Sequence, residues 1–269
     1  MDKIKLTREE FDSIEKDNNT FYLISDEMKV YKGEGSIAPE YKPYVPPTID
    51  YFYAEALANT QLYFTKTYES QLPSIQYSIG DTEHWNDYSF ASGQKISITT
   101  GQRCYFKSTT EFMNENNIMG ANYIVFESTG DIKLGGDVNS MRNFADLQQN
   151  SFSDMFERNS HIIEADIFRD YQLATRCYSY MFSNCSSLIK LPNLPATTLA
   201  DYCYQGMFNR CTKIKLSTTQ DSTYKTAWSF PSDGVGAGGS NHGSMMFQNT
   251  GGTFTDSAIV NTTYYGAWD

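Results

Sequence analysis

A 26-residue pattern that occurs three times in the second half of the chain constrains the fold more than any other feature. The pair Met155-Phe156 returns as Met181-Phe182 and again as Met207-Phe208. Leucine recurs at 147, 173 and 199, an aromatic residue at 152, 178 and 204, and a branched aliphatic residue at 162, 188 and 214. A fixed period of this length is typical of a solenoid, in which each repeat buries its apolar face against its neighbours. Solenoids usually present surfaces to partners, so the repeat favours binding or assembly over catalysis.

Each repeat is predicted to contain one helix and one short strand. In the third copy, Thr198 is a candidate N-cap, because its hydroxyl can accept a hydrogen bond from a free amide of the first turn. The following residues Leu199, Tyr202, Cys203 and Met207 share one helical face. Short strands are expected around residues 188–191 and 213–216, which gives a parallel ladder.

The pattern is less regular at its end. Met246-Phe247 lies 39 residues after Met207-Phe208, and a glycine-rich stretch over residues 234–243 separates them. This spacing indicates a degenerate last repeat that carries an inserted loop, since terminal repeats are usually atypical.

Between residues 50 and 138 the dominant period becomes two. Candidate strands lie near residues 62–65, 75–79, 95–98, 103–107 and 123–126. Ile96 and Ile98 are expected to face the core with Cys104 and Phe106, across a hairpin that turns near Gly101. Short strands separated by glycine at this spacing predict a β-sandwich.

The first residues predict a small unit of one helix and one hairpin. Thr7 and Glu10 fit a capping box, which starts a short helix with Phe11 and Ile14 on one face. Two strands are predicted near 20–24 and 28–31. Four prolines within residues 36–49 then predict an extended linker.

The predicted fold class is therefore a multidomain α+β chain with a helix-hairpin anchor, an antiparallel β-sandwich and a short α/β leucine-rich-repeat-like solenoid. The expected boundaries are an anchor at 1–35, a linker at 36–49, a sandwich at 50–138, repeats with a glycine-rich insertion at 139–254, and a C-terminal tail at 255–269.

Composition excludes two classes of partner. The formal net charge is -11, and there is no basic run of the kind that binds nucleic acid. No stretch reaches the roughly 18 consecutive apolar residues of a membrane span. The charged start, Met1-Asp2-Lys3, lacks the apolar core of a secretory signal, so synthesis and folding in a reducing cytoplasm are expected.

Candidate chemistry is sparse, and no cofactor, metal or catalytic residue is predicted. The four cysteines of the repeats lack the C-x₂₋₄-C spacing of zinc sites, so they are interpreted as core residues. Residues 234–239 match G-x-G-x-x-G without the flanking strand and helix of a dinucleotide site. Asp81, Glu83, His84 and Asp87 are interpreted as a polar loop rather than a calcium site. His161 and His242 have no partners in the pattern of a catalytic triad.

The repeats resemble the BspA-like type of leucine-rich repeat. The resemblance covers roughly residues 60–216 and rests on the stretches Leu194–Leu199 and Leu199–Cys211. Its upstream part, Gln76–Trp85, Gly93–Lys95 and Gln102–Lys107, resembles the β domain that often precedes such repeats. Only three copies are regular, and the first lacks both cysteines.

The N-terminus resembles the anchor module of phage fibre and appendage proteins, through Lys5–Phe11, Asn19–Asp26 and Lys29–Gly33. Together the resemblances imply a virion surface protein of the head-fibre type found in crAss-like phages. They imply attachment to capsid or other virion proteins through residues 1–35. The candidate contacts are the apolar and aromatic residues Phe11, Phe21, Tyr22, Leu23, Val30 and Tyr31. A homotrimer or homodimer is expected, by analogy with bundled fibres.

The predicted function is a structural, non-enzymatic role with weak adhesion to a host surface or glycan. Tyr180 and Tyr202 are candidates to stack on sugar rings, although packing within the repeats is the interpretation we favour. A bacterial surface adhesin of the BspA-like type is the first alternative, and a carbohydrate-active enzyme domain is the second.

Overall fold

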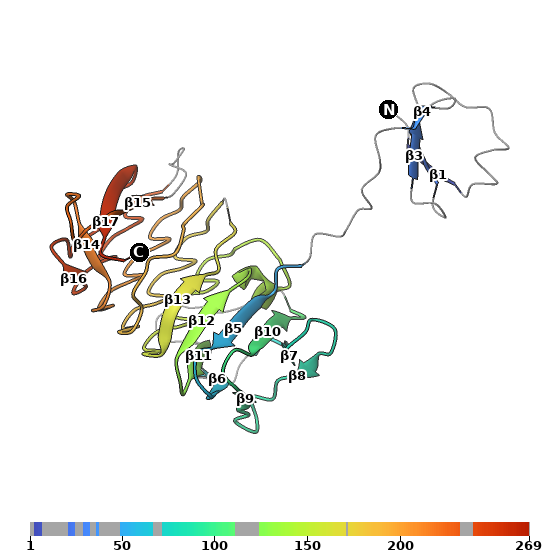
Figure 1. Ribbon diagram of the computed structural model, residues 1–269, viewed down its shortest axis with the longest axis horizontal. Helices are drawn as coiled ribbons and strands as arrows, with labels where there is room; N and C mark the ends of the chain where they lie inside the picture. The colour runs from blue at the N-terminus through green and yellow to red at the C-terminus, as the bar shows by residue number, and fades with distance from the viewer. Residues whose placement is uncertain are drawn as a thin grey trace. The chain divides into compact units, whose positions relative to one another are not determined.

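The computed structural model describes residues 49–66, 72–110, 124–170, 172–231 and 239–268 in full, together with the backbone of four strands in the first 48 residues. The chain divides into two compact units, Met1–Asp50 and Tyr51–Asp269. Figure 1 labels most of the strands of both units, though not β2. Each unit is treated by itself below.

The described part of the first unit is a four-stranded sheet. Its strands β1 (Lys3–Leu6), β2 (Phe21–Ile24), β3 (Lys29–Lys32) and β4 (Ser36–Ile37) lie in the order β1-β2-β3-β4. The predicted hairpin corresponds to β2 and β3, which are antiparallel, but β1 adds to β2 in parallel. The prediction of a helix-hairpin anchor is therefore wrong. The cause is the start of the chain, where Ile4 and Leu6 alternate with lysines, as expected for a strand.

Two other expectations for this region fall partly outside the described residues. The predicted helix, with Phe11 and Ile14, lies there, as do residues 38–48 of the predicted linker. The linker was expected to begin at residue 36, where the structure has β4 instead.

The second unit begins with two sheets, all of whose strands except β13 come from residues 51–135, and we call these residues the sheet half. The larger sheet has the order β13-β12-β5-β10-β7-β8 and the smaller has the order β11-β6-β9. The strands of the larger sheet are β5 (Phe52–Ala56), β7 (Ile75–Ile79), β8 (Asn86–Asp87), β10 (Arg103–Ser108), β12 (Ile132–Gly135) and β13 (Ile162–Asp166). Those of the smaller are β6 (Thr60–Lys66), β9 (Ile96–Ile98) and β11 (Ile124–Ser128).

The sheets pack face to face through phenylalanines from both. Phe52 and Phe106 come from the larger sheet and Phe64 and Phe126 from the smaller, with ring centroids 5.2–5.7 Å apart. The predicted hairpin at Gly101 is wrong, because β9 and β10 belong to different sheets and the exposed turn between them leads from one sheet to the other. The larger sheet is also mixed rather than antiparallel, since β12 pairs in parallel with β13 from the repeat region.

The repeats form stacked turns instead of helices. Among the described residues the single helical segment is the 3₁₀ helix η1 (Val138–Arg142). Within each repeat three residues spaced four apart are left-handed, as at Asp154, Arg158, Tyr180 and Asn184, and no α-helix accommodates such residues. The predicted α/β solenoid is therefore wrong. Successive four-residue turns place apolar side chains at nearly the same spacing as a helix, which explains why the sequence predicts helices.

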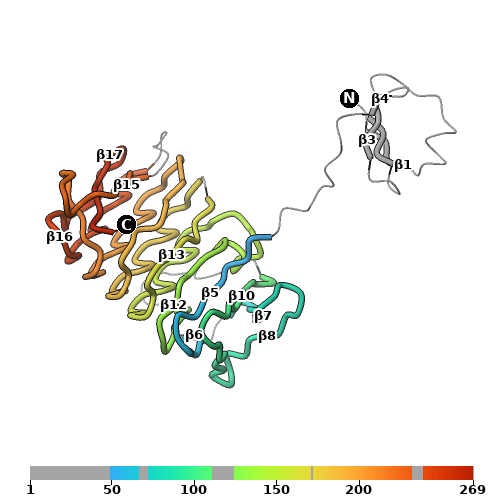
Figure 2. The backbone as a smooth tube through the Cα atoms, viewed as in Figure 1, coloured from blue at the N-terminus to red at the C-terminus, as the bar shows by residue number. Residues whose placement is uncertain are grey.

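The main-chain hydrogen bonds of these turns alternate. The amides of Asp154 and Phe156 donate to the carbonyls of Ser179 and Met181 in the next repeat, at 3.0 and 2.9 Å. The amide of Met155, between them, donates to Phe152 three residues earlier. We call this stack the turn ladder, residues 150–158, 176–184, 202–210 and 241–249, and Figure 2 shows its turns one above another.

Aromatic columns run through the turn ladder. Phe156, Phe182, Phe208 and Phe247 stack with centroids 5.1–5.9 Å apart and planes within 17° of parallel. The column therefore continues through the irregular fourth copy, which the sequence interprets as a degenerate repeat. A second column contains the aromatic residues at 152, 178 and 204.

The repeat cysteines are free and buried. The thiols of Cys185 and Cys211 donate to the main-chain oxygens of Phe156 and Phe182, at 3.1 and 3.0 Å. Burial raises the pKa of both thiols. They are core residues that also link neighbouring repeats.

A last sheet covers the end of the turn ladder, in the order β15-β17-β14-β16. Its strands are β14 (Lys215–Ser217), β15 (Thr226–Phe230), β16 (Gly251–Gly252) and β17 (Thr262–Gly266). Trp228 and Tyr264 from this sheet contact the ring of Phe247. The segment expected to be a tail, residues 255–269, thus supplies a central strand. In the described parts of the chain, no helix has the length and apolar character needed to cross a membrane.

Candidate functional site

A cavity of about 590 Å³ lies where η1 and the loop after β13 meet, and we call it the acidic pocket. The parallel pairing of β12 with β13 brings the segments that follow these strands together. Its walls combine polar and apolar side chains: Asp137, Asn139, Phe144, Ala145, Asp146, Leu147, Arg169, Asp170, Gln172 and Leu173. A cavity of this size is in the range of small-molecule sites.

Asn139 is at the centre of the polar wall. Its side-chain amide donates to both carboxylate oxygens of Asp170 at 2.9 Å and to Asp137 at 3.1 Å. Asp137 also caps η1 by accepting from the main-chain amide of Asn139. The hydroxyl of Tyr178, from the second aromatic column, donates to Asp170. The pocket is therefore fixed to the turn ladder by a hydrogen-bond network.

The two aspartates next to Asn139 have perturbed acidities. Burial raises the pKa of Asp170, and the hydrogen bonds from Tyr178 and Asn139 oppose this effect. Burial likewise raises the pKa of Asp137, and the charge of Asp170 adds to the rise. Such shifts are common at functional sites, although structural networks produce them too.

One acceptor of this wall has no partner. The side-chain oxygen of Asn139 is buried and has no hydrogen bond within the part of the chain that the structure describes. Buried acceptors in native proteins are nearly always satisfied. The oxygen is fully buried within the wall, so it does not itself face a ligand in the cavity.

Phe144 forms the rim of the pocket and is 44% exposed. Asn143 and Phe144 both adopt left-handed backbone conformations, with φ of 53° and 55°. This conformation is unfavourable for a bulky side chain, and such strain tends to occur at functional sites. The local fold therefore holds an apolar ring in solvent at the mouth of a polar cavity.

Phe144 belongs to an aromatic patch that we define as Tyr51, Trp85 and Phe144. The ring centroid of Tyr51 lies 6.0 Å from that of Phe144 and 4.9 Å from that of Trp85. The ammonium group of Lys107 lies 4.0 Å from the Trp85 ring centroid, and burial lowers its pKa. The aromatic surface that begins with Phe144 at the pocket thus continues through Tyr51 to Trp85, which do not line the pocket.

Charge limits what the acidic pocket can bind. Three carboxylates line it, Asp137, Asp146 and Asp170, against the single guanidinium of Arg169. That guanidinium already lies 3.2 Å from a carboxylate oxygen of Asp166. The pocket is therefore suited to neutral or cationic ligands. An aromatic rim with planar carboxylate and amide groups can contact both the apolar face and the hydroxyls of a sugar.

The tyrosines predicted from sequence lie elsewhere. Tyr180 and Tyr202 are half-buried on the turn ladder, both with positive φ. The ring of Tyr180 covers Gly206, where an added Cβ would lie 2.2 Å from it, and Tyr202 is covered by the guanidinium of Arg176. The structure brings neither to the acidic pocket and shows both in packing contacts.

The six residues predicted for virion attachment are in the first unit. Phe21, Tyr22 and Leu23 lie in β2, and Val30 and Tyr31 lie in β3. Phe11 is outside the described residues. The sheet therefore brings five of the six positions onto two paired strands.

The loop at Asp81 is held by its own hydrogen bonds. Asp81 accepts from the amides of Glu83 and His84, from the His84 ring and from the hydroxyl of Ser78. These bonds hold the pKa of Asp81 well below its usual range. In the regions that the structure describes, no group of three or more His, Cys, Asp or Glu side chains is placed to hold a metal ion.

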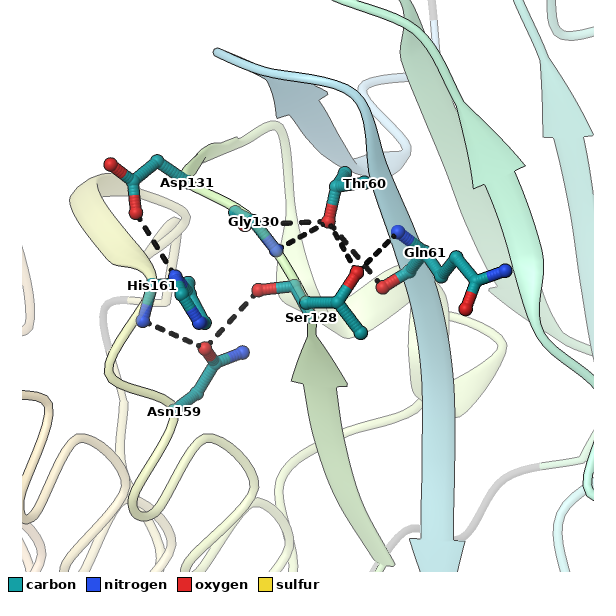
Figure 3. Close-up of polar contacts among 8 residues, drawn as sticks. Thr60, Gln61, Ser128, Gly130, Asp131, Asn159 and His161 are labelled. Atoms are coloured by element: carbon teal, nitrogen blue, oxygen red, sulfur yellow. Dashed lines mark hydrogen bonds and ion pairs between the residues drawn. The ribbon is translucent and has the colours of Figure 1, made fainter.

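A serine, a histidine and an aspartate meet near β11, as Figure 3 shows, but they are not connected as a catalytic triad. The His161 ring lies 3.1 Å from Asp131, whereas the hydroxyl of Ser128 donates to the Asn159 side chain at 3.2 Å. Ser128 is also buried. No hydrogen bond among the described residues joins this serine to the imidazole. The cluster connects the first repeat to the sheet half.

Sequence reasoning missed the acidic pocket and the aromatic patch. The one local signal was Asn143, a residue type that tolerates the left-handed conformation. Comparison of the chain with protein-family models, with curated proteins and with solved structures gave no significant match. The functional hypothesis therefore depends on the sequence and on the site geometry.

Proposed function

We propose that this chain is a structural, non-enzymatic protein of a virion surface that binds glycan weakly through the acidic pocket and the aromatic patch. Its first unit attaches to other virion proteins, and residues 51–268 carry the binding surface. The observation that carries the adhesive role is Phe144, an exposed ring held in a strained conformation at the mouth of a polar pocket. The virion location is supported by the resemblance of the N-terminus to phage fibre anchors.

The ligand of this surface is a neutral or amino sugar. Sugar hydroxyls are donors for the carboxylates of Asp137 and Asp146, which line the same cavity. The rings of Phe144 and Tyr51 offer apolar surface to the opposite face of the sugar. A single shallow site of this type gives weak binding, which identical copies of the chain strengthen through effective concentration.

A carbohydrate-active enzyme is the second candidate, because burial raises the pKa of two carboxylates in one pocket. A raised pKa is what a general acid requires near neutral pH. Against this, Asp170 already accepts hydrogen bonds from Asn139 and Tyr178, which favours a structural role for it.

The binding test compares Phe144→Ser with Ile259→Ser in a glycan-binding assay on the intact chain. Ile259 is a matched control, because it is 63% exposed and does not line the pocket. Loss of one aromatic contact of about 1 kcal/mol weakens binding roughly fivefold to tenfold. Equal binding by the two variants contradicts the assignment. Release of sugar product by the wild type, lost in Asp137→Asn, favours the enzyme instead.

The attachment test uses a chain that lacks residues 1–35. Since residues 51–269 form their own compact unit, the truncated chain is expected to fold and bind glycan yet fail to join assembled particles. Electron microscopy of labelled particles measures incorporation. Normal incorporation of the truncated chain contradicts attachment through the first unit.

A further inference from the structure

A second cavity of about 590 Å³ lies between the repeats and the C-terminal strand, and we call it the lysine groove. Residues from three parts of the unit line it. Glu164 comes from β13, Ile189 and Lys190 from the second repeat, and Lys213 and Lys215 from the third. Trp268, which follows β17, also lines the groove. The site shares no lining residue with the acidic pocket.

Positive charge is concentrated in the groove. Lys190, Lys213 and Lys215 are all exposed, and in the described part of the chain none of them forms an ion pair. The one acid of the groove, Glu164, is already paired with Lys133 at 3.0 Å. Because the whole chain carries a net charge of -11, three neighbouring lysines without acidic partners are not an average property of its surface.

The groove also has an apolar side. Ile189 is 39% exposed, and the half-buried ring of Trp268 packs over Gly266, where an added Cβ would lie 2.3 Å from it. The hydroxyl of Thr226 donates to the main-chain oxygen of Trp268, which fixes that residue on the last sheet. An aromatic ring held beside ammonium groups can contact the face of a sugar while the lysines contact its acidic groups.

We propose that the lysine groove binds an anionic saccharide, a chain of sugars that carry carboxylate groups. The volume suits one or two sugar rings, and the lysines supply the charge complementarity that the acidic pocket cannot offer to such a ligand. A nucleic acid is a poorer fit, because its binding depends on a longer basic surface and this chain is strongly acidic overall. The inference goes beyond the proposed function, since it uses a different surface and the opposite charge.

The test measures binding of trigalacturonate to the intact chain by calorimetry, with the uncharged galactose trisaccharide as the reference ligand. We expect trigalacturonate to bind more tightly than the neutral sugar, and added salt to weaken its binding. Lys213→Glu is expected to lower the affinity at least about tenfold, a loss of about 1.4 kcal/mol. The matched control is Lys225→Glu, because Lys225 is an exposed lysine of the same unit outside the groove.

Further variants separate the alternatives. Lys213→Gln removes the charge with less disturbance and should weaken binding in the same direction, whereas Trp268→Ala should weaken binding of trigalacturonate but not of inorganic sulfate. Phe144→Ser should leave the affinity unchanged, which distinguishes this site from the proposed glycan surface. The proposal is overturned if Lys213→Glu binds like Lys225→Glu, if sulfate binds as tightly as trigalacturonate, or if a single-stranded oligonucleotide binds more tightly than either.

Discussion

The sheet half and the turn ladder bury aromatic rings in different geometries. In the sheet half, Phe64, Phe106 and Phe126 meet edge to face, at interplanar angles of 65–86°. In the turn ladder, Phe182 and Phe208 stack within 12° of parallel. Rings from two opposed sheets can approach at any angle, whereas repeats of constant length place equivalent rings in equivalent orientations.

The difference affects how each region distributes its packing. Phe126 contacts the rings of Phe52, Phe64, Phe106 and Phe156. Removal of its side chain therefore leaves a cavity that all four neighbouring rings share. Phe208 has ring contacts with one neighbour above and one below. We therefore expect the turn ladder to unfold locally, one repeat at a time, and the sheet half to unfold as a whole.

The largest expected loss of stability occurs in two variants, Phe208→Ala in the turn ladder and Phe126→Ala in the sheet half. Each leaves a buried cavity and is expected to lower the free energy of unfolding by ~3–5 kcal/mol. Hydrogen exchange should show the loss of protection for Phe208→Ala concentrated in residues 202–210 and 241–249. For Phe126→Ala the loss should cover the described strands of the sheet half as a whole. Uniform loss of protection in both variants contradicts the local character of the turn ladder.

A smaller effect is expected for Gly206→Ala, measured against Gly93→Ala by thermal unfolding. The two glycines have nearly the same φ, +59° and +58°, so the backbone cost of about 1 kcal/mol is shared. Only at Gly206 does the new Cβ meet a neighbour, the Tyr180 ring at 2.2 Å. We expect Gly206→Ala to lower the free energy of unfolding by an additional amount of about 1–2 kcal/mol. Tyr180→Ala should remove that additional loss, and failure to do so excludes the contact as its cause.

The smallest expected effect is on the pH dependence of stability, which one aspartate in the turn ladder and one in the sheet half should change in opposite directions. In the turn ladder, burial raises the pKa of Asp154 from 3.8 to about 7, and the charge of Glu157 adds to the rise. The folded state then binds the proton more tightly than the unfolded state, so stability falls as pH rises from about 4 to about 7. Asp154→Asn should remove this slope and stabilise the protein above pH 7 by about 1–2 kcal/mol, a value reduced for partial exposure.

Asp81 in the sheet half is the control for that experiment. Its pKa is lowered by hydrogen bonds from the amides of Glu83 and His84. It contributes stability above its unfolded pKa and loses that contribution as pH falls, so Asp81→Asn should change stability in the opposite direction. Urea denaturation of both variants between pH 2 and pH 8 measures the two slopes, that of Asp154 from about pH 4 to about pH 7 and that of Asp81 below about pH 4. Equal slopes contradict the assignment.

The sequence predicts the repeat register well, and the structure shows why. Phe156, Phe182 and Phe208 stack because equal spacing along the chain becomes equal position in space. The choice between helix and turn could not be predicted in the same way, because apolar side chains recur about every four residues in both. Hydrogen bonds between repeats decide it, and they appear only when the neighbouring repeat is present.

The acidic pocket could not be predicted from the sequence, for a different reason. Asp137 and Asp170 are 33 positions apart, and they meet because β12 pairs in parallel with β13 from the repeats. A boundary expected at residue 138 separates these strands into different domains. A pocket that depends on long-range pairing across such a boundary leaves no local pattern, so its residues look like unrelated polar positions.

Trp228 gives the protein an intrinsic optical probe. Its indole is buried, donates to the main-chain oxygen of Pro192 at 2.9 Å, and lies 5.8 Å from the Phe247 ring at the end of the aromatic column. Tryptophan emission shifts to longer wavelength when water reaches the ring. Opening of the last repeats should therefore shift the emission maximum of Trp228 to longer wavelength without any added label. In a chain in which Trp85 and Trp268 are replaced by phenylalanine, this shift should report that opening alone.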